Sequence, residues 1–169
     1  SLVYAYHPTT GNLAGVLAPG GVSLTLGYDG SLLTDQTWTG PVAGSVGYIY
    51  DNSFRRASLS VNGADAIAYS YDNDSLLTGA GGLILSRSAQ NGLLVGTGLG
   101  GVTDAFGHNG FGEPISYTAS FGGGALLGFR YEYDKLGRIV TRTETISGAA
   151  DVYVYGYDLA GRLATVRKN

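Results

Sequence analysis

The chain has 169 residues, 44% of them hydrophobic and 14% charged, with a net charge of −3. This balance suits a folded domain, excludes a disordered chain and gives no general attraction to nucleic acid. The absence of cysteine excludes disulfides and thiolate metal sites, and no apolar run is long enough to span a membrane. The 29 glycines and 13 tyrosines favour strands and turns over helices.

A short phrase recurs along the chain, and its weaker copies come first. They begin at Tyr4-Ala5-Tyr6-His7, Tyr28-Asp29, Tyr48-Ile49-Tyr50-Asp51 and Tyr69-Ser70-Tyr71-Asp72. The first copy leads to Gly11-Asn12-Leu13, and the fourth carries Ser75-Leu76-Leu77 where later copies have Gly-Arg-Leu. The second copy matches the fourth with one residue deleted. Self-similarity of this kind is the signature of a repeat architecture.

The complete phrase, Tyr-x-Tyr-Asp-x-x-Gly-Arg-Leu/Ile, appears at residues 131–139 and 155–163. Before it lie a degenerate copy at 86–94 and a copy at 106–113 that has Asn109 for Asp and Glu113 for Arg. The key positions of the copies are then 7, 29, 51, 72, 89, 109, 134 and 158. Units of this length have room for two strands and two turns.

The phrase predicts a strand, a turn and a return strand. Tyrosines two residues apart point to one face of a strand. An aspartate that follows can accept hydrogen bonds from backbone N–H groups of a turn, and glycine three residues later is favoured by the turn. We expect Arg138 and Arg162 to lie across neighbouring tyrosines or to pair with a turn aspartate. Each repeat is therefore predicted to be one β-hairpin.

Other segments support this interpretation. Residues 22–26, 58–61, 139–146 and 152–157 alternate between apolar and polar side chains, which predicts strands with one drier and one wetter face. Turn signals separate the phrases at Pro19-Gly20-Gly21, Asn62-Gly63, Gly79-Ala80-Gly81-Gly82, Gly122-Gly123-Gly124 and Ser147-Gly148-Ala149. The predicted fold class is all-β: an array of stacked antiparallel β-hairpins with seven or eight units over residues 1–169.

The residues that matter most in this prediction are structural. They are Tyr4, Tyr6, Tyr28, Asp29, Tyr48, Tyr50, Asp51, Tyr69, Tyr71, Asp72, Asn109, Gly112, Tyr131, Tyr133, Asp134, Gly137, Arg138, Tyr155, Tyr157, Asp158, Gly161 and Arg162. No catalytic, cofactor-binding or metal-binding residue is predicted. Repeats of this kind build surfaces and walls more often than single active sites.

Three more specific functional interpretations compete with this structural one. Gly96–Gly101 fits G-x-G-x-x-G, but residues 102–106 read as a strand where a dinucleotide site needs a helix, so a loop is expected. His7 and His108 are the only imidazoles, and both fall beside or at a turn, so an enzyme is disfavoured. Asp72-Asn73-Asp74 lacks the glycine and glutamate of a calcium loop, so the aspartates are expected to cap backbone.

The phrase resembles the YD repeat of bacterial Rhs proteins, which teneurins and the cocoon subunits of insecticidal toxin complexes share. Residues 71–82 and 111–119 also resemble Rhs core sequence. The resemblance implies a curved strip of hairpins that forms a segment of a hollow shell around a C-terminal toxic segment. In these families an autoproteolytic segment after the repeats releases the cargo, and neither that segment nor a toxin domain is found here. The missing methionine and the repeat phrase close to residue 169 indicate an excerpt of a longer array.

The expected function is therefore structural: a non-catalytic segment of an encapsulating shell that houses a C-terminal toxin or effector. Its expected partners are the rest of the parent shell and the cargo, together with self-association through edge strands. The alternative is a carbohydrate- or protein-binding repeat module in adhesion, since tyrosine rings can stack on sugars. No cofactor, nucleic acid or membrane span is expected, and the resemblance implies a secreted or cell-surface bacterial protein.

Overall fold

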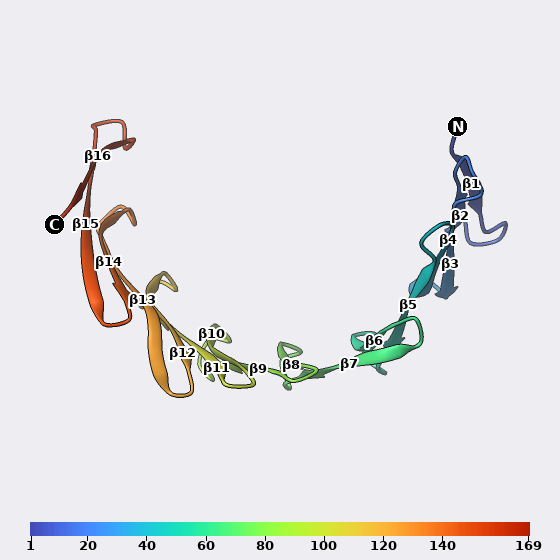
Figure 1. Cartoon of the computed structure of the whole chain (residues 1–169), viewed down its shortest axis with the longest axis horizontal. Coiled ribbons are helices and arrows are strands. Elements are labelled where there is room, and N and C mark those ends of the chain that lie inside the picture. The colour runs from blue at the N-terminus through green and yellow to red at the C-terminus, as the bar shows by residue number, and fades with distance from the viewer. The chain divides into compact units, whose positions relative to one another are not determined.

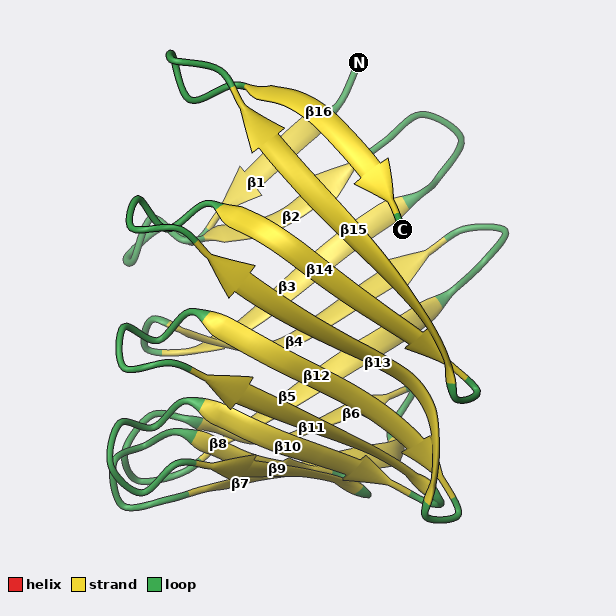
Figure 2. Cartoon of the chain, turned by 90° about the vertical axis from the view of Figure 1, so that its left-hand side faces the viewer, coloured by secondary structure: helices red, strands yellow, loops and turns green.

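The computed structural model describes residues 1–169 and contains strands and turns only (Figure 2). No helix long and apolar enough to cross a membrane is present. The chain divides into two compact units, residues 1–81 and 82–169. Each unit is described by itself below.

The first unit consists of eight strands that pair antiparallel in chain order, from blue to green in Figure 1. Their bounds are β1 Val3–Tyr6, β2 Leu13–Leu17, β3 Ser23–Asp29, β4 Leu32–Thr39, β5 Gly44–Tyr50, β6 Arg56–Val61, β7 Ala64–Tyr71 and β8 Leu77–Ala80. Each strand is joined to the next by a short turn, so alternate turns lie at opposite edges of the sheet. The repeat phrases supply every second turn.

The second unit has the same organisation. Its strands are β9 Leu83–Arg87, β10 Leu94–Leu99, β11 Val102–His108, β12 Pro114–Phe121, β13 Gly124–Tyr133, β14 Ile139–Ile146, β15 Ala149–Tyr157 and β16 Leu163–Lys168. They also pair antiparallel in chain order. The predicted all-β array of consecutive antiparallel hairpins is thereby confirmed, while its treatment as one domain over 1–169 stays a prediction.

The two faces of the second unit differ in chemistry. On one face Phe106, Tyr117 and Phe129 lie directly opposite one another on β11, β12 and β13. We call this the aromatic face. On the other, the hydroxyl face, Gly128 lies between Thr118 and Thr145 on its neighbouring strands. The missing side chain at Gly128 leaves a shallow groove of ≈ 360 Å³.

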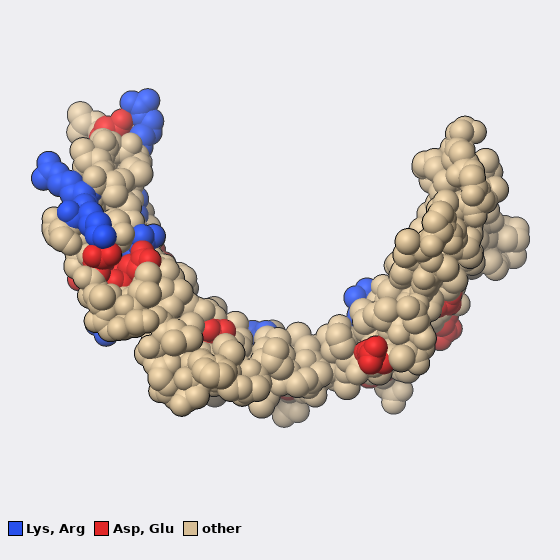
Figure 3. Space-filling model, in the orientation of Figure 1, with Lys and Arg blue, Asp and Glu red and all other residues tan.

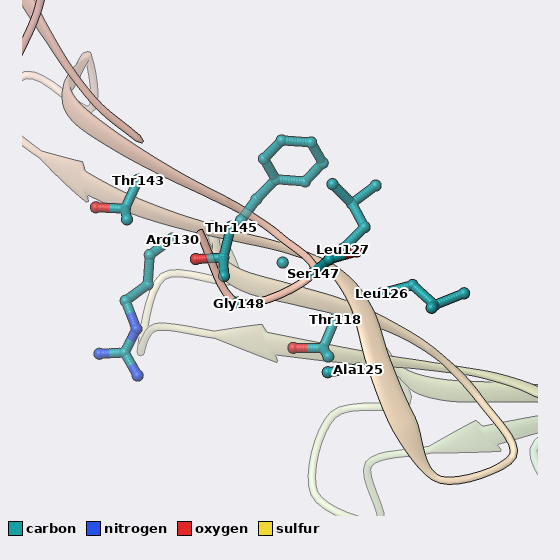
Figure 4. A pocket seen from close by; sticks show the side chains of 11 residues that line it. Thr118, Ala125, Leu126, Leu127, Arg130, Thr143, Thr145, Ser147 and Gly148 are labelled. Atoms are coloured by element: carbon teal, nitrogen blue, oxygen red, sulfur yellow. The ribbon is translucent and has the colours of Figure 1, made fainter. Parts of the chain in front are cut away.

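Figure 4 shows this division from close by. Arg130, Thr143 and Thr145 extend to one side of the strands, and Leu127 extends to the other. The alternation of residues along β13 and β14 produces this separation, because successive side chains of a strand point to opposite faces. The predicted alternation of side-chain types between the two faces is therefore seen in this unit.

The first unit repeats the pattern. Leu24 is paired with Trp38 on one face, and the next residues along each strand, Thr25 and Thr37, are paired on the other. On that second face the Ser23 and Thr39 hydroxyls are 2.8 Å apart and share a hydrogen bond. In both units, pairs of large apolar or aromatic side chains and pairs of small hydroxyl side chains thus lie on opposite faces.

Neither unit has a buried core. No hydrophobic or polar side chain is fully buried, and several large ones, such as Phe121 and Ile84, are more than half exposed. Each unit is a single layer, so its stability comes from backbone ladders and cross-strand side-chain pairs, which contribute roughly 0.2–1 kcal/mol each.

The turns between the phrases follow their glycine signals. Asn62 and Gly63 have φ of 52° and 73°, and Gly122 and Gly123 have φ of 57° and 84°. Ser147 and Gly148 likewise have φ of 47° and 88°. Two successive residues with positive φ define the tight hairpin turn that matches strand twist. The Asn62 side chain also accepts a hydrogen bond of 2.7 Å from the backbone N–H of Ser45.

One expected loop is a strand instead. Residues 94–99 form β10, and only Gly100 and Gly101 make the turn to β11. A Cβ at Gly96 would be 3.1 Å from the carbonyl oxygen of Asp104, so these glycines fit a closely packed ladder. Cross-strand pairing here overrides the low strand propensity of glycine. Because a strand follows, no helix N-terminus exists to hold a dinucleotide.

Candidate interaction site: the repeat turns and their junctions

The turn at residues 134–138 shows what the complete phrase does. The Asp134 N–H donates to the carbonyl of Arg138 at 2.9 Å, and the Gly137 N–H donates back to the carbonyl of Asp134 at 3.1 Å. Oδ1 of Asp134 accepts from the backbone N–H groups of Leu136 and Arg138 at 2.9 and 3.0 Å. Its Oδ2 accepts from Arg138 Nε at 2.7 Å. One carboxylate therefore satisfies both the loop backbone and the arginine.

Two other turns repeat this geometry. Oδ1 of Asp158 accepts from the N–H groups of Ala160 and Arg162, and its Oδ2 accepts from Arg162 Nε at 2.9 Å. In the first unit, Asp51 makes the corresponding bonds to the backbone of Ser53 and to Arg55. The prediction that the phrase aspartates cap their turns is confirmed at these positions.

These contacts lower the pKa of all three aspartates. For Asp134 the main cause is the side-chain hydrogen bond from Arg138, followed by the Arg138 backbone N–H. For Asp51 and Asp158 the largest cause is the backbone N–H of the arginine four residues later. Hydrogen bonds to a carboxylate favour its charged form. The turns are therefore held together by ionised aspartates.

The arginine is not required for the turn. Asp72 accepts from the backbone N–H groups of Asp74 and Leu76 at 3.0 and 2.9 Å, although Leu76 stands at the arginine position. The glycine is not required either, because Ser75 and Phe54 occupy its position with φ of 64° and 60°. Gly137 and Gly161 have φ of 73° and 79° at the same position. The aspartate acceptor is what these turns share.

The turn at 109–113 has the same backbone with the opposite side-chain polarity. Asn109 Oδ1 accepts from the N–H groups of Phe111 and Glu113 at 2.9 and 3.0 Å. Its Nδ2 donates to Oε2 of Glu113 at 2.6 Å, where an aspartate would accept from an arginine. Gly112 has φ of 81° and keeps its predicted place in the turn. The exchange of both residues preserves the hydrogen bond.

Three copies depart from this loop. At the first, the His7 N–H donates to the carbonyl of Asn12, one residue further along than in the regular turns. The degenerate copy does the same from Ser88 to Leu93, so its key residue is Ser88 and not position 89. Asp29 was expected to cap its turn but ends β3 opposite Leu32, because the shorter copy makes a two-residue turn in place of the longer capped loop.

Consecutive hairpins are joined by tyrosine hydroxyls. The tyrosine immediately before the key residue donates to a carbonyl in the preceding hairpin, close after its turn. The bonds are Tyr28 to Leu13 at 3.1 Å, Tyr50 to Leu33 at 2.8 Å, Tyr71 to Arg56 at 2.8 Å, Tyr133 to Pro114 at 2.6 Å and Tyr157 to Ile139 at 2.7 Å. These bonds recur in both units and connect five of the repeats to the one before.

The other predicted tyrosines lie in the same strands. Tyr4 and Tyr6 are in β1, Tyr48 in β5, Tyr69 in β7, Tyr131 in β13 and Tyr155 in β15. None of them makes a hydroxyl hydrogen bond to a neighbouring hairpin. The two tyrosines of a phrase therefore have different roles. The sequence pattern alone does not distinguish them.

Arginine completes some of the junctions. The guanidinium of Arg55 lies 4.5 Å from the ring centre of Tyr71, and that of Arg138 lies 4.6 Å from the ring centre of Tyr157. In each case the arginine of one turn covers the tyrosine, at the next turn, whose hydroxyl joins the two hairpins. Arg162 pairs with Asp158, and its side chain is 81% exposed. The expectation that Arg138 and Arg162 contact tyrosine or a turn aspartate is confirmed.

A second cluster on the aromatic face was not found by sequence reasoning. Asp104 accepts from the Thr97 and Tyr117 hydroxyls at 2.7 Å each. The Thr97 bond, then the Tyr117 bond, lowers the pKa of Asp104, and the bond to Asp104 raises the pKa of Tyr117. No motif in the sequence indicates this cluster, because the three residues are brought together only by the register of β10, β11 and β12.

Charged pairs continue this face toward the last strands. Glu144 and Asp151 lie opposite each other on β14 and β15, and each has a cation nearby. Arg142 is 2.9 Å from Glu144, and Lys168 is 2.7 Å from Asp151. Figure 3 shows cationic atoms beside acidic ones over these strands. The pairs balance two carboxylates that would otherwise repel each other.

The chemistry of these sites is that of recognition and packing. The structure holds no group of three or more histidine, aspartate or glutamate side chains suited to a metal ion. His7 bonds to Thr9 within its own turn, and His108 ends β11. The Thr9 hydroxyl is 3.1 Å from the His7 imidazole, and no carboxylate is hydrogen-bonded to that imidazole.

The sequence model of the teneurin YD-shell family matches residues 1–169. The chain belongs to the teneurin YD-shell family. In its complete YD phrases, at 131–139 and 155–163, the aspartate of the turn pairs with the arginine. A search of curated proteins finds no match.

Solved structures show the same YD-shell fold. The TcdB2-TccC3 crystal structure is 15% identical with a TM-score of 0.55, and its complex with Cdc42 is 14% identical with a TM-score of 0.55. TcdB2-TccC3 without its hypervariable C-terminal region is 15% identical with a TM-score of 0.54. In all three the match covers 99% of this chain and 9% of the other, so the chain spans about a tenth of their length.

Proposed function

We propose that this chain is a non-catalytic wall segment of an encapsulating shell whose parent protein houses a C-terminal toxin or effector. The observation that carries the proposal is the recurring junction: in both units, tyrosine hydroxyls bond hairpins to the preceding ones. Such a junction extends a sheet repeat by repeat. One similar structure is described as lacking a hypervariable C-terminal region, which fits a parent with a variable cargo.

The proposed partners follow from this role. They are the rest of the parent shell and the cargo that it encloses, and the parent is proposed to be a secreted or cell-surface bacterial protein. Family membership and the single-layer architecture support this assignment.

Limited proteolysis of the full parent protein tests the proposal. We expect its C-terminal segment to resist a protease that cleaves the same segment after denaturation. A parent carrying Gly137→Val and Tyr157→Phe should lose part of that protection, because its wall is weakened at one junction. Cleavage of the C-terminal segment at the same rate in the native and denatured parent would contradict an enclosing role.

The absence of catalysis is tested separately. A hydrolase screen of the 169-residue chain should give no turnover above background. Activity that disappears in His108→Ala would refute the non-catalytic assignment.

A second candidate function is a carbohydrate- or protein-binding module in adhesion. The aromatic face favours it: the rings of Phe106 and Tyr117 are 5.2 Å apart, and those of Tyr117 and Phe129 are 6.1 Å apart, next to the Asp104 carboxylate. Aromatic rings beside an acceptor can stack on and hydrogen-bond to sugars. Reproducible sub-millimolar binding on a glycan array, lost in Phe129→Ala, would favour this function over the wall.

We also propose that the isolated chain self-associates through its outermost strands. β1 and β16 each pair with one neighbour, and all their residues are exposed. Unpaired strand edges are templates for further pairing. Light scattering should show concentration-dependent oligomers, and a strict monomer at high concentration would contradict this proposal.

A further inference from the structure

Two junctions between consecutive turns are completed by an arginine. Arg55 covers the Tyr71 ring and donates from Nη1 to the Ser75 hydroxyl at 3.0 Å in the next turn. Arg138 covers the Tyr157 ring, and its Nη1 lies 3.7 Å from the place of a Cβ at Gly161. A guanidinium on the face of a tyrosine is attracted by the ring. The same position in each turn therefore supplies a cation to the next repeat.

At the junction between the turns at 109–113 and 134–138, this position holds Glu113. Its Oε2 accepts from Asn109, while its Oε1 lies 2.9 Å from the place of a Cβ at Gly137 and accepts no hydrogen bond. The carboxylate thus extends toward the next turn as the two arginines do. Burial, and then the negative charge of Glu113, raises the pKa of Tyr133. This junction therefore has a carboxylate at the position where the other two have an arginine.

A groove lies at the same junction. It has a volume of ≈ 520 Å³ and is lined by Phe111, Glu113, Asp134, Lys135, Leu136 and Gly137. The two turns follow each other along one edge of the second unit, as Figure 2 shows for the loops β11–β12 and β13–β14. The Phe111 and Leu136 side chains are 92% and 77% exposed. Both side chains are therefore accessible to the methylene groups of a ligand that reaches the Glu113 carboxylate.

We propose that this groove binds an arginine side chain of a partner polypeptide. The guanidinium would pair with Oε1 of Glu113, and its methylene groups would pass between Phe111 and Leu136. The planar, weakly hydrated guanidinium suits a site formed by a carboxylate and an aromatic ring better than an ammonium does. The two arginine-filled junctions provide the precedent within the same chain. This site lies at the turn edge and does not depend on what the sheet faces enclose.

Two charged groups of the groove have to be considered. Both oxygens of Asp134 are engaged by its own turn and by Arg138, so Asp134 adds little attraction for a second cation. Lys135 also lines the groove but forms no ion pair with Glu113. Glu113 Oε1 is therefore the acceptor open to a ligand.

The test is a titration of the isotope-labelled 169-residue chain with the peptide acetyl-Leu-Arg-Leu-amide, followed by NMR. Saturable shifts are expected at Phe111, Glu113 and Leu136, and the lysine analogue should bind several-fold more weakly. Glu113→Gln keeps the Asn109 hydrogen bond and should weaken binding at least fivefold. Glu113→Arg should abolish binding, because it supplies the guanidinium internally.

The matched control is Glu144→Gln, a carboxylate on the aromatic face, which should leave the affinity unchanged. Equal binding by wild type and Glu113→Gln would overturn the proposal, as would the absence of saturable shifts. A loss of binding in Lys135→Ala would also overturn it, because the peptide would then rest on the ammonium side of the groove. The peptide needs no shell or cargo, so failure here leaves the protease test of the wall unaffected.

Discussion

The turns at 134–138 and 109–113 are the same loop, but the hydrogen bond between their first and fifth side chains runs in opposite directions. Asp134 accepts from Arg138, whereas Asn109 donates to Glu113, and the backbone hydrogen bonds coincide. The difference teaches that the loop requires an acceptor oxygen at its first residue, while the side chain of its fifth residue can either donate to the first or accept from it. The sign of the fifth residue is free within the loop and matters for the next repeat.

The largest expected effect comes from removing the shared acceptor. Asp134→Ala leaves the Leu136 and Arg138 N–H groups and the Arg138 guanidinium without their partner. We expect the melting temperature, measured by circular dichroism, to fall by several degrees. Asp134→Asn keeps Oδ1 but sets two donors against each other, so it should also destabilise.

A charge exchange sharpens this comparison. The double variant Asp134→Asn/Arg138→Glu converts the turn to the 109–113 type and should recover most of the stability that either single variant loses. A double-mutant cycle measures this coupling. Additive losses would show that the two loops are not interchangeable.

Gly137→Val should cost about 1–3 kcal/mol of unfolding free energy, because a branched side chain would occupy a φ of 73° and would crowd Glu113. Urea unfolding checks this value. Ser75→Gly, at the equivalent position with φ of 64°, is the matched control and should be neutral or stabilising. Unchanged stability of Gly137→Val would contradict the turn geometry.

Tyr157→Phe should cost about 0.5–1.5 kcal/mol, the usual net value of one hydrogen bond, because it removes the bond to the Ile139 carbonyl. Tyr155→Phe in the same strand has no such bond and should change stability little. The difference between the two variants isolates the junction from general packing. Equal effects would show that the hydroxyl does not join the hairpins.

The smallest expected effect is a loss of stability at low pH. Asp51, Asp134 and Asp158 have lowered pKa values in the folded chain, against about 3.9 for an unfolded aspartate. Their contribution to stability is complete above that value and is lost as the pH falls through the lowered pKa values. Melting temperature should therefore decline below about pH 4, and Asp134→Asn should decline less.

The sequence predicted the hairpins, the turns and the capping aspartates, because Tyr-x-Tyr-Asp-x-x-Gly combines two local rules: strand alternation and turn chemistry. It did not reveal that Tyr157 bonds to Ile139 while Tyr155 does not, since that difference depends on which tyrosine faces the preceding turn. The Thr97–Asp104–Tyr117 cluster was also missed, because strand register brings the three together. Gly96 and Gly98 indicated a loop, but backbone pairing of β10 with its neighbours outweighs the low strand propensity of glycine.

The tyrosine junctions also have a direction. Each bond reaches back between 15 and 19 residues, from a tyrosine to a carbonyl that was synthesised earlier. A growing chain would therefore find each docking point already made when the next hairpin leaves the ribosome. Contacts of such short sequence separation form quickly. Assembly would then proceed hairpin by hairpin, with each new tyrosine bonding to a hairpin that has already folded.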